Sequence, residues 1–148
     1  MDHQELSDLL EIQQLTARYM ALSARKEHGR WLEVFTPDAT YSAFGTDYGL
    51  DDFPKLLDSA PPGQYVGNAP VVELRGDTAT GVQHYVFIDQ RTHDMRLAWY
   101  DDEYVRTPEG WRIARRSTTF MRRGGAFDAG KAHDPARYVA GVEVDPGA

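Results

Sequence analysis

Four long strand-forming segments with short polar turns between them make up the second half of the chain, and they limit the possible folds most. The segments are residues 64–75, 77–90, 95–107 and 110–123. The turns RGDT, RTHD and TPEG join them, and each carries the Gly, Asp or Pro typical of tight connections. Strands joined by such short turns pair antiparallel, so the sequence predicts a long antiparallel meander.

The first half of the chain has the three- and four-residue spacing of helices. Residues 5–24 form one amphipathic helix, whose apolar stripe consists of Leu9, Ile12, Leu15, Tyr19 and Leu22. Asp2 and Glu5 resemble a capping box at its start. Two shorter helices are predicted at residues 27–35 and 51–60, each followed by proline, with a strand at residues 39–44 between them.

Helices followed by a long antiparallel sheet predict an α+β fold. We expect three N-terminal helices packed on a curved, mostly antiparallel sheet, because a twisted sheet wrapped around a long helix leaves a tapered, cone-shaped hollow. Residues 1–123 are predicted to form a single domain that encloses this pocket. Residues 124–148 are rich in Gly, Asp, Pro and Ala, and we expect them to form a tail or a flap.

Composition narrows the function classes. The chain has 148 residues and a formal net charge of −7, which argues against a nucleic-acid partner because phosphate binding needs a concentrated basic surface. It has no cysteine, so disulfides and thiolate metal sites are excluded, and we expect a cytoplasmic protein. No apolar run reaches the length of a membrane span, and the five histidines lack metal-site spacing. We therefore expect no membrane partner, metal or cofactor.

The strand at residues 95–107 has an unusual pattern. At the two-residue period of a strand, Arg96, Ala98 and Tyr100 share one face, whereas Leu97 and Trp99 share the other. A half-solvated strand should alternate apolar and polar residues, and neither face is purely one or the other. We interpret the Arg96 face as lining the hollow. The Leu97 face would be an outer surface that a second copy of the chain covers, which predicts a homodimer.

Three segments, residues 15–45, 67–81 and 102–116, resemble the SnoaL-like branch of the nuclear transport factor 2 like superfamily. The most specific is the last, DEYVRTPEGWRIARR, with an aromatic and acidic strand, a polar turn and then Gly-Trp-Arg-Ile. The resemblance covers roughly residues 8 to 122 and implies a cone-shaped fold. It is a weak guide to function, because one scaffold hosts many chemistries.

The resemblance also implies a catalytic dyad that this chain lacks. Relatives include polyketide cyclases, scytalone dehydratase, a hexachlorocyclohexane dehydrochlorinase and ketosteroid isomerase. The dehydratase-like members share an Asp near the end of the first helix and a His after the third, so that the acid orients the imidazole that removes a proton. The matching positions here are Ala24 and Gln64. Neither residue takes a proton near neutral pH, so other residues act or the pocket only binds.

The alternation of side chains along the strands and the family resemblance together give a set of candidate site residues. Tyr41, Tyr85 and Tyr100 would polarise a substrate oxygen, and Asp89 or His84 would move a proton. The substrate would be held by further side chains, namely Tyr19, Gln64, Phe87, Arg96 and Arg116.

Each candidate also has a plainer interpretation. The tyrosines are core residues unless they converge on one cavity, and Asp89 is a turn residue unless it faces Arg96 across a hairpin. Arg116 pairs with an acid of the neighbouring strand, one of Asp101, Asp102 and Glu103. Alternation puts His84 on the face opposite Tyr85, outside the cavity, unless a bulge near Gly81 reverses the register.

The leading functional hypothesis is a cofactor-free enzyme for a hydrophobic, oxygenated small molecule such as a polyketide or terpenoid intermediate. It would catalyse cyclisation, isomerisation or elimination. The rival is a non-catalytic ligand-binding or accessory protein that has kept the pocket without the dyad. A third possibility is the small subunit of a ring-hydroxylating oxygenase, which shares this fold.

Overall fold

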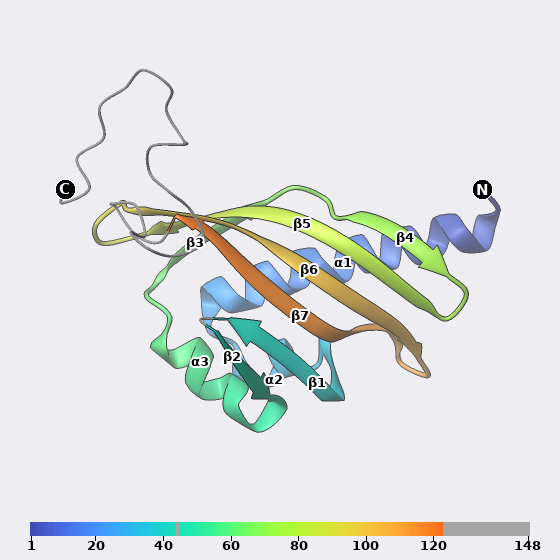
Figure 1. The fold of residues 1–148 in the computed structure, drawn as a ribbon, viewed down its shortest axis with the longest axis horizontal. Coiled ribbons are helices and arrows are strands. Elements are labelled where there is room, and N and C mark those ends of the chain that lie inside the picture. The colour runs from blue at the N-terminus through green and yellow to red at the C-terminus, as the bar shows by residue number, and fades with distance from the viewer. Residues whose placement is uncertain (44, 123–148) are drawn as a thin grey trace, which may run out of the picture.

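A computed structural model describes residues 1–43 and 45–122, and it has a long helix lying along one face of a curved sheet (Figure 1). The helices are α1 (His3–Arg25), α2 (His28–Leu32) and α3 (Phe53–Ser59), with a 3₁₀ turn at Leu50–Asp52 before α3. The predicted α+β class and cone-shaped architecture are confirmed. The predicted tail or flap at residues 124–148 lies outside the described residues.

Helix α1 forms because its ends are capped and one face is apolar. The Asp2 carboxylate accepts a hydrogen bond from the Glu5 backbone N–H at 2.8 Å, and the Glu5 carboxylate accepts one from the Asp2 N–H at 2.9 Å. This is the predicted capping box. At the other end Lys26 adopts the left-handed conformation, with φ 54°, that stops the helix. The buried stripe includes Ile12, Leu15, Tyr19 and Leu22.

Seven strands form one sheet in the order β2-β1-β7-β6-β5-β3, with β4 also pairing β5. Their bounds are β1 Phe35–Ala43, β2 Thr46–Gly49, β3 Gly63–Gly67, β4 Val71–Arg75, β5 Thr78–Asp89, β6 Met95–Thr107 and β7 Gly110–Arg122. Pairing is antiparallel except between β1 and β7, which run parallel. The sheet is therefore mostly antiparallel, as predicted.

Three sequence-based boundaries were wrong. The predicted strand 64–75 is two strands, β3 and β4, that both pair with β5 and are separated by residues 68–70. Pro70 has no N–H to give to a ladder, which explains the break. Phe35, predicted to end a helix, begins strand β1, and strand β2 was not predicted. The predicted strand at residues 39–44 is confirmed as far as Ala43. The earlier start of β1 comes from the pairing of Phe35 with Ile113 on β7, which local propensity does not indicate.

A bulge in β7 decides which of its side chains face the helix layer. Opposite the consecutive β6 residues Glu103 and Tyr104 stand Arg115 and Ile113, so Ala114 is an extra residue. The extra residue shifts the alternation by one. As a result Ile113 on one side of the bulge and Arg116 on the other are both fully buried.

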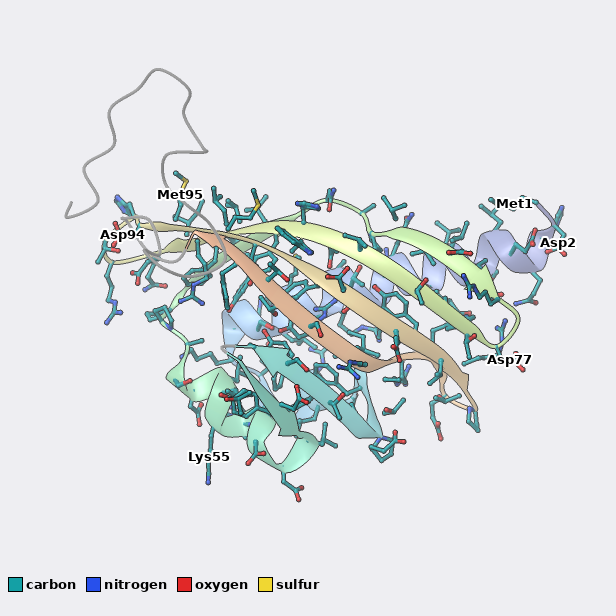
Figure 2. All side chains as sticks on the ribbon, in the orientation of Figure 1. Met1, Asp2, Lys55, Asp77, Asp94 and Met95 are labelled. Carbon is teal, nitrogen blue, oxygen red and sulfur yellow. The ribbon has the colours of Figure 1, made fainter. Side chains whose placement is uncertain are left out.

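One end of the sheet, marked by Asp77 in Figure 2, is tied to α1 by a polar cluster. The buried Asp8 carboxylate on α1 accepts two hydrogen bonds from Arg106 at 2.7 Å each and one from the Trp111 indole N–H at 3.0 Å. The Asp77 carboxylate accepts a further one from Arg106 at 2.9 Å. The hydrogen bonds from Arg106 are the main reason that the pKa of Asp8 lies well below its ordinary value near 3.8.

A second buried ion pair lies in the middle of the sheet. Arg116 on β7 donates from Nε and Nη2 to the two Asp102 carboxylate oxygens on β6, both at 2.7 Å. Both side chains are 0% exposed. The Tyr104 hydroxyl donates to the same carboxylate at 2.7 Å. The Asp102 oxygens are thus fully engaged, as a buried charge requires.

No helix within residues 1–43 and 45–122 combines the length and the apolar character that crossing a bilayer demands.

The buried apolar side chains form one core between α1 and the sheet. Its fully buried members include Ile12, Val34, Phe53, Tyr104 and Ile113.

Substituting Asp102 by Ala will leave the Arg116 guanidinium buried without its counter-charge. We expect a loss of about 3–5 kcal/mol in the free energy of unfolding, measured by urea denaturation. Glu103→Ala on the exposed face of the same strand is the matched control, with an expected change within about 0.5 kcal/mol. Equal losses in the two variants would contradict a structural role for the pair, whereas Asp102→Leu combined with Arg116→Met should recover much of the stability.

Substituting Asp8 by Asn will alter how stability depends on pH. The folded-state pKa of Asp8 lies below the unfolded-state value, so its contribution is complete above about pH 5 and is lost as the pH falls below about 4. As the pH falls below about 4, the wild type should lose more stability than Asp8→Asn, which should be the less stable of the two at pH 7. Urea unfolding at several pH values measures this, with the exposed Asp38→Asn as control. A wild-type pH profile in Asp8→Asn would contradict the assignment.

Candidate functional site

A cavity of about 130 Å³ lies between the three helices and the concave face of the sheet. Among the described residues its walls are aromatic and aliphatic, with hydroxyl groups, the Trp31 indole N–H and one guanidinium as the polar groups. The lining residues are Tyr19, Ser23, Trp31, Tyr41, Leu56, Leu57, Ser59, Ala60, Pro61, Tyr65, Tyr85, Arg96, Tyr100 and Phe120.

Strand pairing brings the tyrosines together. Along β5 and β6 the register pairs Tyr85 with Ala98 and Gln83 with Tyr100, so Tyr85 and Tyr100 are diagonal neighbours on the inner face. Their rings stack with centroids 4.4 Å apart and an interplanar angle of 13°. Tyr19 from α1 meets Tyr100 edge-on, with centroids 5.7 Å apart. The Tyr41 hydroxyl and the Thr118 hydroxyl are hydrogen-bonded at 2.7 Å.

The phenols of Tyr41, Tyr85 and Tyr100 are neutral at physiological pH. Burial raises the pKa of Tyr85 to about 12 and raises the pKa values of Tyr41 and Tyr100 well above the ordinary value of 10. A neutral phenol in a desolvated cavity donates a hydrogen bond strongly and is a poor base. The tyrosine cluster is therefore suited to polarising an oxygen atom of a ligand.

Arg116 lies behind the tyrosines and does not line the cavity. Its guanidinium carbon is 3.9 Å from the Tyr100 ring centroid and 4.2 Å from that of Tyr19. The structure thus shows the alternative interpretation of Arg116, an ion pair with Asp102, and not direct contact with a bound molecule. Its remaining link to the site is a cation–π contact through two lining residues.

Arg96 is the charged residue of the described lining. Its guanidinium carbon lies 5.2 Å from the Phe87 ring centroid and 5.6 Å from that of Phe120. The buried Nε atom has no hydrogen-bond partner among the described residues. Phe87, predicted to bind substrate, is buried beneath Arg96 and does not itself line the cavity.

Gln64 points away from the cavity, and its neighbour Tyr65 points in. Gln64 is exposed and pairs with Ile88, whereas Tyr65 pairs with Phe87 and shares its inward face. The prediction matched Gln64 to a histidine position of the family. It passed over Tyr65, although large aromatic side chains are usually buried. Ala24 is likewise outside the lining, and the adjacent Ser23 is in it.

Asp89 and His84, the predicted proton carriers, also lie outside the cavity. The Asp89 carboxylate accepts hydrogen bonds from the Arg91 and Thr92 backbone N–H groups at 2.8 and 3.2 Å, which is its turn-residue interpretation. The bond from Arg91 contributes most to lowering the pKa of Asp89. His84 is exposed on the outer face, stacked on Trp99 with ring centroids 5.6 Å apart, because Gly81 lies within unbroken pairing and causes no reversal.

The lining contributed by the described residues contains no His, Asp or Glu. Across residues 1–43 and 45–122, no three such side chains converge as metal ligands would. Sequence reasoning missed Ser23, Trp31, Phe120 and the α3 segment. Phe120 could have been found from its alternation with Arg116 along β7, but the position of α3 depends on tertiary packing.

Comparison with known proteins gives relatives that share sequence with this chain. Residues 4–117 match the family model described as SnoaL-like domain. An uncharacterized protein of Mycobacterium tuberculosis and one of Mycobacterium bovis are each 39% identical over 132 residues, which cover 78% of this chain and 86% of the relative.

Solved structures share the fold at lower identity. A function-unknown protein from Mycobacterium tuberculosis superposes with a TM-score of 0.74 at 22% identity, covering 93% of this chain and 83% of that one. An NTF2-like protein with a cystatin-like fold from Novosphingobium aromaticivorans gives 0.73 at 25%, covering 80% and 84%. A hexachlorocyclohexane dehydrochlorinase gives 0.72 at 18%, covering 91% and 98%. The chain belongs to the SnoaL-like domain family of the NTF2-like superfamily.

Proposed function

We propose that the protein is a cofactor-free enzyme whose substrate is a hydrophobic, oxygenated small molecule, and that it catalyses an isomerisation, a cyclisation or an elimination. The observation that carries the proposal is the convergence of neutral tyrosine hydroxyls on one apolar cavity. Apolar cavities with a few convergent polar groups are the usual form of small-molecule sites. The fold shared with a dehydrochlorinase supports a reaction of this kind.

The tyrosines would act on an oxygen of the substrate. Tyr85 and Tyr100 stack with their rings 4.4 Å apart, so both hydroxyls belong to one part of the cavity wall. Hydrogen bonds from such donors stabilise the negative charge that develops on a carbonyl or enolate oxygen. The Arg96 cation adds to this stabilisation from the same cavity.

The proton acceptor in this proposal is not a lining carboxylate or imidazole. The described lining has neither, and His84 and Asp89 face other surroundings. Ser23 cannot replace them, because its hydroxyl donates to the Tyr19 carbonyl oxygen at 2.7 Å. The reaction therefore suits a substrate whose C–H becomes acidic once its carbonyl is polarised, with water or the substrate's own oxygen taking the proton.

Cavity size limits the substrate. A hydrocarbon-lined cavity of about 150 Å³ accommodates a benzene molecule. The cavity here is about 130 Å³, so its enclosed part suits a body of about one ring. Polyketide and terpenoid intermediates were both expected as substrates. A small monocyclic compound fits a cavity of this volume better than a fused polyketide.

A non-catalytic ligand-binding protein is the second candidate. The absence of a carboxylate or imidazole from the described lining favours it, because proton abstraction then lacks an obvious protein base. The two candidates share the cavity and differ in whether a bound molecule is converted.

Phe substitutions at Tyr85 and Tyr100 test the enzymatic proposal. They remove the hydroxyls and keep the rings, so we expect the rate with a converted substrate to fall by about 10²–10³-fold for each, with folding retained. Turnover by mass spectrometry on monocyclic ketones, enols and epoxides supplies the measurement. Tyr48→Phe is the matched control, since Tyr48 is partly buried on β2 and does not line the cavity.

Two outcomes would count against the enzymatic proposal as stated. Full turnover in both Phe variants would contradict the assigned role of the tyrosines. Compounds that raise the melting temperature of the wild type, yet are recovered unchanged, would favour the ligand-binding protein.

We also propose that the protein is a homodimer through the outer face of the sheet. Leu97 and Trp99 lie on this face, where Val66 and Met95 are 54% and 42% exposed. Covering such a surface removes apolar area from water. Light scattering after gel filtration should give twice the chain mass, and Leu97→Glu should give the single mass. A wild-type mass of one chain at micromolar concentration would contradict the proposal.

A further inference from the structure

We propose that the ligand of this cavity is a carboxylate, with its anionic group on Arg96 and an apolar ring among the tyrosines. The inference rests on the proposed function, whose substrate class it narrows. Three observations support it: the net positive charge of the described lining, the contacts of Arg96, and the engagement of Asp89 with other partners.

The described lining has an unbalanced positive charge. Arg96 is its charged residue, and the other described lining residues are tyrosines, hydroxyl groups, apolar side chains and the indole of Trp31. The second cation nearby, Arg116, is neutralised by Asp102 through two bonds of 2.7 Å. A cation in an apolar cavity is costly without a counter-charge, so a bound anion would supply what the described protein groups do not.

The guanidinium of Arg96 is held between two aromatic rings at the cavity wall. Phe87 and Phe120 hold its carbon at 5.2 and 5.6 Å from their ring centroids, which restricts the side chain. The Nε–H is buried and unpaired among the described residues, and buried N–H groups are nearly always bonded in native proteins. Planar guanidinium groups bind planar carboxylates through paired hydrogen bonds, which makes a carboxylate the matching partner.

The acid expected to face Arg96 is engaged elsewhere. A position of Asp89 opposite Arg96 across the hairpin was the alternative to its turn-residue interpretation, but the strand register pairs Arg96 with Phe87. The Asp89 carboxylate is taken by the N–H groups of Arg91 and Thr92 and by the Arg91 guanidinium at 3.6 Å. Asp89 is therefore not the counter-ion of Arg96.

Two tyrosines of the lining lie near Arg96. The Tyr65 ring is 4.9 Å from the ring of Phe87, over which the Arg96 guanidinium lies at 5.2 Å. Burial raises the pKa values of Tyr65 and Tyr85, and the charge of Arg96 opposes this rise. Both rings line the cavity, with centroids 5.9 Å apart. A carboxylate at Arg96 would thus have phenol donors beside it, while its ring meets the apolar wall.

Calorimetric titration of the full-length protein with benzoate and benzamide tests the inference. The two probes have the same shape and differ in charge. We expect benzoate to bind about tenfold or more tightly, because hydrogen bonds to a charged group are the stronger ones. Acetate, an anion without the ring, should bind at least tenfold more weakly than benzoate.

Variants identify Arg96 as the source of the preference. Arg96→Gln should bring the benzoate and benzamide affinities within about twofold of each other, and Arg96→Lys should retain part of the preference. Arg115→Gln is the matched control, because Arg115 is exposed on the outer side of β7 and its loss changes the net charge equally. Thermal unfolding establishes that each variant is folded.

The outcomes are separate from those of the proposed function. Equal binding of the two probes to the wild type, no benzoate binding at 10 mM, or a preference that survives Arg96→Gln would each overturn the carboxylate inference. A neutral ketone converted by Tyr85 and Tyr100 would then still uphold the enzyme. Conversely, tight benzoate binding with no turnover of any monocyclic acid would uphold the inference and count against the enzyme.

Discussion

The buried Asp102–Arg116 pair is the interaction on which the inner face of the sheet depends. It joins the two central strands where both side chains are withdrawn from solvent. The Tyr104 hydroxyl donates a further hydrogen bond to the Asp102 carboxylate, and the Tyr19 and Tyr100 rings flank the guanidinium. The Tyr19 and Tyr100 rings also form part of the cavity wall. The same pair therefore balances two buried charges and fixes the position of the aromatic groups that a ligand would meet.

The pair also explains why β6 has no purely apolar face. The inner face of β6 carries Arg96, Ala98, Tyr100 and Asp102, then Tyr104 and Arg106. Each polar member has its own surroundings: Arg96 in the cavity, Asp102 with Arg116, and Arg106 with Asp8. A pattern that looks inconsistent for a strand is thus a sequence of separate polar sites along one tapered interior.

The sequence predicted the architecture well because its signals were local. The stripe of α1, its capping box and the hairpin turns all involve residues close in the chain. Side-chain alternation along β5 and β6 correctly gave the inward direction of Tyr85, Arg96 and Tyr100. The strand pairing that was not predicted, between β1 and β7, involves residues far apart in the chain. For the site, aligning two family positions selected Ala24 and Gln64, whereas the adjacent Ser23 and Tyr65 line the cavity.

The division of β3 from β4 has a further effect on how the molecule behaves in a crowded solution. A long unpaired sheet edge is a template for strands of other molecules and promotes aggregation. Here that margin consists of two five-residue strands interrupted before Val71 by Pro70, and the opposite margin, β2, has four residues. Neither border offers a continuous row of free backbone groups, so the fold resists polymerising through its own β-structure.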